Sequence, residues 1–132
     1  MSASCAAACV ALTGTYHGLL RRWGQANRDT LERYIAGIIE GTRWALSPAN
    51  KDAAAKILAE RLKVSTATAT QTWQLMTDPK FGIAPDARFD MQGFRNVLAL
   101  RAEVEGSWGG KPPAAERYID LSYYEGAMKR LK

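Results

Sequence analysis

The side chains best suited to catalysis or metal binding are few in this sequence, and they lie apart from one another. Cys5 and Cys9 stand four residues apart, close enough for one helix face but without the second pair of a zinc motif. The only histidine is His17, and no acid beside it could orient it as a general base. Glu103 and Glu105 are two residues apart and would lie on different helix faces. We therefore expect no enzyme, no metal site and no cofactor.

One segment, residues 54–76, has the pattern of a helix-turn-helix. Ala59 would lie at the close helix–helix contact, and Val64 and Ser65 would form the turn and the cap of a second helix. Two features count against DNA binding by this segment. Lys63 stands where a turn glycine is usual, and the second helix has no Lys or Arg for phosphate contacts. A small DNA-binding regulator is the alternative interpretation, and a helical hairpin with the same turn is the simpler one. We do not expect specific nucleic-acid binding.

Apolar periodicity predicts an all-α fold of about five helices, with at most one strand near the N-terminus. In the first helix, Leu31, Ile35 and Ile38 recur on one face. A short helical turn is expected just before it, at 21–25. The expected helices cover about 28–46, 50–62, 65–76, 90–106 and 120–131. Their starts follow residues that cap helices with a side-chain oxygen, namely Asn27, Asn50, Ser65, Asp90 and Asp120.

The four tryptophans divide into two groups. Trp23, Trp44 and Trp73 recur at core-like positions of the expected helices, so we interpret them as packing residues. Trp108 lies in a glycine-flanked loop and is expected to be exposed.

Length and composition favour a globular protein. A chain of 132 residues suits one domain, which we place at 21–132 after an irregular lead-in or strand at 1–20. With 47% hydrophobic and 23% charged residues, the chain is of neither the disordered nor the fibrous class. The net charge of +5 comes from dispersed basic residues, which is typical of a solvated surface. We expect no membrane insertion, and no export signal because the first basic residue is Arg21.

Four blocks in order resemble the C-terminal region of periplasmic substrate-binding proteins of ABC transporters. The branch is the one serving importers of nitrate, taurine, aliphatic sulfonates and thiamine-precursor pyrimidines. The blocks lie at 22–29, 43–50, 78–98 and 110–124, and the similarity extends over roughly residues 13–131. The resemblance implies a partial remnant of a two-lobed α/β solute-binding fold, of which this chain would hold the closing helical segment.

The same resemblance implies a function. It is non-catalytic binding of a small, often anionic solute, with the solute and an ABC permease as partners of the parent protein. It also implies a periplasmic location, although without a signal the chain would be cytoplasmic as encoded. Ligand contacts would fall at Thr13, Thr15 and Tyr16. We expect self-association, because the apolar faces of the first and last helices would lack their sheet. These faces comprise Ile35, Ile38, Ile39, Leu121 and Tyr124.

Overall fold

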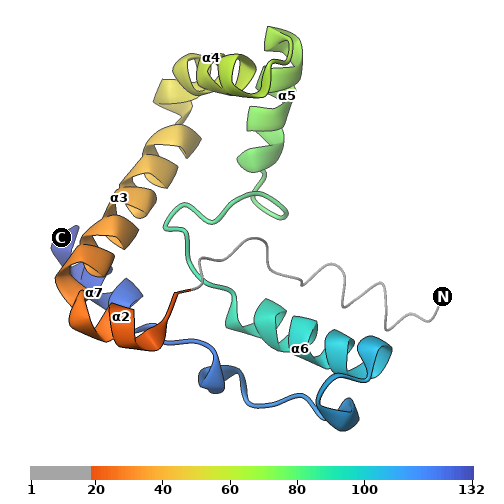
Figure 1. The fold of residues 1–132 in the computed structure, drawn as a ribbon. Coiled ribbons are helices and arrows are strands. Elements are labelled where there is room, and N and C mark those ends of the chain that lie inside the picture. The colour runs from red at the N-terminus through yellow and green to blue at the C-terminus, as the bar shows by residue number, and fades with distance from the viewer. Residues whose placement is uncertain (1–18) are drawn as a thin grey trace. The chain divides into compact units, whose positions relative to one another are not determined.

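The computed structural model describes residues 19–132, and within this range the chain is all-α, as the sequence predicts (Figure 1). The α-helices are α2 (Arg21–Ala26), α3 (Arg28–Leu46), α4 (Lys51–Leu62), α5 (Thr66–Met76), α6 (Met91–Glu105) and α7 (Ser122–Arg130). Short 3-10 turns occupy Pro48–Asn50, Ser107–Gly110 and Ala115–Arg117. The expected lead-in or strand at 1–20 falls almost wholly outside the described residues.

Local capping chemistry sets the start of α5 and both ends of α6. The Ser65 hydroxyl accepts from the Thr68 N–H at 3.1 Å, and Asp90 Oδ1 accepts from the Gly93 N–H at 2.9 Å, as predicted. Gly106 ends α6 with a φ of 65°, a left-handed conformation that glycine adopts without steric cost.

The two asparagines do not cap in the predicted way. The side-chain amide of Asn27 donates to the Trp23 carbonyl, and that of Asn50 donates to the Trp44 carbonyl, both at 2.9 Å. Each asparagine therefore satisfies a carbonyl of the preceding helix. Each of these carbonyls also accepts from a backbone N–H, that of Asn27 or that of Ser47, so the amide adds a second hydrogen bond at the helix end.

The chain divides into two compact units. Of the described residues, unit 1 comprises 19–28 and 89–123, and unit 2 comprises Asp29–Arg88 and Tyr124–Lys132. In unit 1, Leu98 and Ala102 of α6 are buried together with Ala115. In unit 2, α7 packs along α3, where Ala36, Ile39 and Ala127 form a small buried cluster.

The α4–α5 hairpin completes unit 2 (Figure 1). Its buried residues are mostly alanines, Ala54, Ala55 and Ala69, so the two helices approach closely. Trp73 of α5 supplies the large buried side chain, and its indole N–H donates to the Ala45 carbonyl at the end of α3 over 2.7 Å. The hairpin is thus held to α3 by one buried aromatic residue and one hydrogen bond.

The tryptophan predictions are only partly correct. Trp73 is buried and Trp108 is exposed, as expected, but Trp23 and Trp44 are 46% and 44% exposed. In α3 the buried side is filled by residues such as Ala36 and Ile39, and Trp44 lies on the opposite side of the helix. Periodicity identified an apolar helix but not which of its two apolar faces is covered.

Candidate functional site

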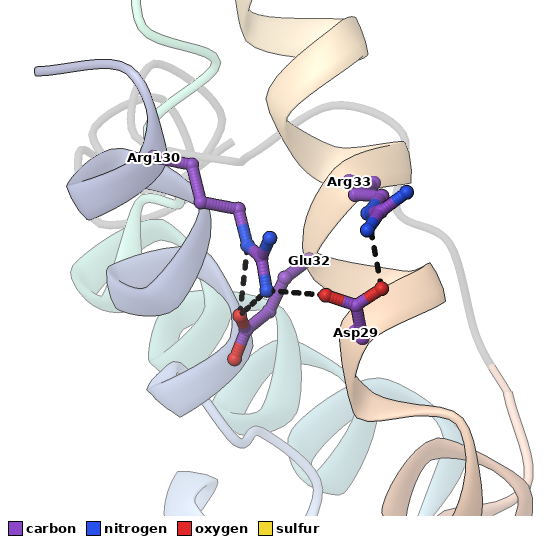
Figure 2. Close-up of polar contacts among 4 residues, drawn as sticks. All are labelled: Asp29, Glu32, Arg33 and Arg130. Atoms are coloured by element: carbon purple, nitrogen blue, oxygen red, sulfur yellow. Dashed lines mark hydrogen bonds and ion pairs between the residues drawn. The ribbon is translucent and has the colours of Figure 1, made fainter.

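The most developed polar cluster joins the first turn of α3 to the last turn of α7 (Figure 2). Arg130 donates from Nε and Nη2 to Glu32 Oε2 at 3.1 and 3.0 Å, and from Nη2 to Asp29 Oδ1 at 2.7 Å. Arg33 extends the cluster through an ion pair with Asp29 at 3.0 Å. The acids lie at a helix N-terminus and Arg130 at a helix C-terminus, so both helix dipoles favour the arrangement.

The Glu32 carboxyl group of this cluster lies directly against Gly126 of α7. Glu32 is only 9% exposed, and a Cβ added at Gly126 of α7 would collide with its carboxyl group. The hydrogen bonds that Arg130 donates to Glu32 and Asp29 raise the pKa of its guanidinium, which is permanently charged and cannot act as an acid near neutral pH. This geometry suits a clamp between two helices and does not provide a proton donor.

A second polar connection in unit 2 fixes the loop before α6. Arg43 Nε lies 2.7 Å from Asp86 Oδ1, and the Tyr124 hydroxyl donates to the Asp86 carbonyl at 3.1 Å. Burial, and to a lesser degree the Asp86 carboxylate, raises the pKa of Tyr124, so this phenol keeps its proton. The contacts connect α3, the 86–88 segment and α7.

Unit 1 has its own carboxylate contacts. Hydrogen bonds from Arg101 and Ser107 lower the pKa of Glu105, and those from Ser122 lower the pKa of Asp120. Both carboxylates are exposed and bonded to residues near them in sequence. They stabilise the end of α6 and the start of α7, which is an ordinary role for surface acids.

The helix-turn-helix segment forms the simpler hairpin. Lys63 takes a left-handed conformation with φ 54°, so the turn has the expected shape although it lacks glycine. The sequence places Thr66, Thr68 and Thr70 where they could face a DNA groove, and two of their hydroxyls have partners within the hairpin. The Thr70 hydroxyl donates to the Thr66 carbonyl at 2.9 Å, and the Thr68 hydroxyl shares a hydrogen bond with the Ser65 hydroxyl at 2.8 Å. These hydroxyls satisfy their own helix, as Ser and Thr side chains often do.

The surface best suited to a macromolecular contact is the outward face of α3, which we define as Thr30, Tyr34, Gly37, Gly41 and Trp44. Tyr34 and Trp44 are 51% and 44% exposed, and a Cβ added at either glycine would meet nothing within 4 Å. The neighbouring Ile38 is also exposed. This face lies opposite the side of α3 that α7 covers.

The apolar faces from which we predicted self-association are in part buried inside unit 2. Ile39 is fully buried, and Ile35 and Tyr124 pack against its cluster. The prediction placed this surface wrongly, because α7 covers the side of α3 that was expected to lie against a missing sheet.

The predicted ligand contacts, Thr13, Thr15 and Tyr16, lie outside the described residues, as do Cys5, Cys9 and His17. Between residues 19 and 132, no three His, Cys, Asp or Glu side chains gather as a metal ion would need. In the same range, no helix combines the length and the apolar character needed to cross a bilayer.

Comparison with known proteins points away from the family predicted above. A family model described as the PKHD-type hydroxylase C-terminal domain matches residues 2–25. No curated protein and no solved structure matches the chain. The matched segment is a small part of the 132 residues, so the chain is similar to this domain only there.

This match contradicts the prediction of a periplasmic solute-binding protein and its transport function, and nothing in the comparisons supports the DNA-binding regulator. The physical reason lies in the four blocks on which the resemblance was based, at 22–29, 43–50, 78–98 and 110–124. Those blocks include helix caps and turn residues, such as Pro48 with Asn50, or Gly82 with Pro85. Every helical chain needs such residues where its helices begin and end. Unrelated helical proteins therefore share them, and a similarity at these positions does not indicate a common family.

Proposed function

We propose that the described part of this chain is a non-catalytic helical module that mediates protein association, with a second copy of the chain as its partner. The best-developed polar cluster, around Glu32 and Arg130, is engaged in holding α3 to α7. The exposed apolar side chains are the stronger argument for association. Many of them lie on the surface, where a partner could cover them.

The observation that carries the proposal is the imbalance between core and surface in unit 2. Ile39 is the large side chain that is fully buried, and most other buried positions are alanines. Nine large hydrophobic side chains of the same unit are exposed, namely Tyr34, Ile38, Trp44, Ile57, Leu62, Val64, Leu75, Phe81 and Ile83. Because burial of such a side chain contributes about 1.5–3 kcal/mol, covering even a few of them by association would stabilise this unit.

Sedimentation velocity over a range of protein concentrations tests the proposal. We expect the mass to rise from the 14.5 kDa monomer toward twice that value as the concentration increases through the micromolar range. Far-UV circular dichroism of the same samples verifies that the chain remains helical. A single 14.5 kDa species up to high micromolar concentration would contradict the proposal.

The family match favours a second candidate function. Residues 2–25 are similar to the C-terminal domain of PKHD-type hydroxylases. This similarity supports a role for the helical module in binding a hydroxylase of this type. Calorimetric titration of the purified chain into a purified PKHD-type hydroxylase tests this candidate. Saturable heat with a defined stoichiometry is the expected result, and the absence of heat at micromolar concentrations would dismiss the candidate.

A further inference from the structure

The outward face of α3 has the spacing of a two-helix interface. Its five residues, Thr30, Tyr34, Gly37, Gly41 and Trp44, are separated by four, three, four and three positions along the helix. This is the spacing at which one helix presents a straight seam to another. The seam runs from Thr30 to Trp44 within this 19-residue helix, so it is about 21 Å long. An exposed seam of this kind in a helix already packed on its other side indicates a second helix.

From this seam we infer that two copies of the chain associate through α3, side by side and antiparallel, about a two-fold axis at the level of residues 35–36. The inference rests on the proposed self-association and names the surface that performs it. In this register Tyr34 lies opposite Gly37 of the second copy, and Thr30 lies opposite its Gly41. Since the interface is isologous, each of these contacts occurs twice.

Side-chain size supports this register. A Cβ added at Gly37 or at Gly41 would meet nothing within 4 Å, so the seam is open and carries no side chain at either glycine. Tyr34, half exposed beside them, is large enough to cover such a glycine in the second copy. A glycine inside a helix costs roughly 1 kcal/mol relative to alanine. The close approach of a partner helix gives a physical reason for two glycines on one exposed face.

Charge supports the antiparallel direction. Arg33 and Glu40 flank the seam on the same side, seven residues apart, and both are exposed. In an antiparallel pair this side of one helix faces the same side of the other. In the chosen register Arg33 therefore lies beside Glu40 of the second copy, and Glu40 lies beside its Arg33. A parallel pair would not bring these two side chains together, because each would face the other flank of the partner helix.

Charge reversal gives a direct test by sedimentation equilibrium. Arg33→Glu and Glu40→Arg should each weaken the dimer about tenfold, because two opposite-charge contacts become two like-charge contacts. Arg33→Glu also removes the intrachain ion pair with Asp29, whereas Glu40→Arg leaves that pair in place and is the cleaner variant. An equimolar mixture of the two variants should restore association, since the glutamate introduced at position 33 of one chain then meets the arginine introduced at position 40 of the other. Glu60→Arg, an identical charge change on the exposed surface of α4, is the matched control and should leave the dimer unchanged.

A larger side chain at Gly37 tests whether the partner helix approaches closely at this position. Gly37→Leu should abolish the dimer without unfolding the chain, because the added side chain points into open space in the single copy. Helicity by circular dichroism verifies the fold of each variant. A wild-type dimer that all these variants leave intact would overturn the α3 interface while the proposed function stands. Failure of the mixture to regain affinity would overturn the antiparallel register, and a wild-type monomer at every concentration would overturn both proposals.

Discussion

Replacing Gly126 with alanine should destabilise unit 2, although the same change stabilises most helices. Gly126 lies in α7, where alanine favours helix formation by about 1 kcal/mol over glycine. Here the new methyl group would occupy the position of the Glu32 carboxyl group. A carboxylate in open solvent would swing aside, but this one is 9% exposed and accepts two hydrogen bonds from Arg130.

The magnitude follows from the contacts that must be lost. Breaking a fully buried ion pair costs about 3–5 kcal/mol. The Arg130 side chain is 37% exposed, so water can replace part of its interaction and we reduce this cost to about 2–3 kcal/mol. After the gain of about 1 kcal/mol in helix propensity, the free energy of unfolding should fall by about 1–2 kcal/mol. Gly37→Ala provides the matched control, since its methyl group meets nothing within 4 Å and should raise the same free energy by about 1 kcal/mol.

Urea denaturation followed by far-UV circular dichroism, at a concentration where the chain is monomeric, measures both variants. A double-mutant cycle isolates the cause: in a Glu32→Ala background the carboxyl group is gone, and Gly126→Ala should then be stabilising. If Gly126→Ala stabilises the wild-type chain as much as Gly37→Ala does, Glu32 is not held in place and the clamp between α3 and α7 does not exist.

Three further predictions concern single positions. Gly82→Ala should disrupt the loop after α5, because the new Cβ would collide with backbone oxygens including that of Asp78; loss of protection in hydrogen exchange around this loop would show it. Lys63→Gly should raise the midpoint of urea unfolding by an amount worth about 1 kcal/mol, since glycine adopts the left-handed turn conformation without strain, and an unchanged midpoint would refute this. The hydrogen bonds from Ser122 lower the folded-state pKa of Asp120 below its usual 3.8, so its small stabilisation is present above that pH and lost as the pH falls through the lower folded value. Asp120→Asn should remove this part of the pH dependence in unfolding measured from neutral to acidic pH.

The helices themselves could be predicted from the sequence, because their determinants are local. Ser65 and Asp90 accept from N–H groups three residues ahead, and Gly106 ends its helix through its own backbone freedom. Interactions of this range depend on neighbouring residues alone. They fixed the all-α class and the bounds of α3 to α6 within a residue or two.

Tertiary structure decided which surfaces are covered. Glu32 and Arg130 are 98 positions apart, and nothing in their local sequence marks either as a member of a half-buried cluster. Helix α3 is apolar on two sides, and only the position of α7 determines that Ile39 is buried while Tyr34 and Trp44 are exposed. Periodicity is a property of one helix, whereas burial depends on which other segment packs against it. The sequence alone therefore could not determine that the uncovered side of α3 is the one with two glycines at its centre.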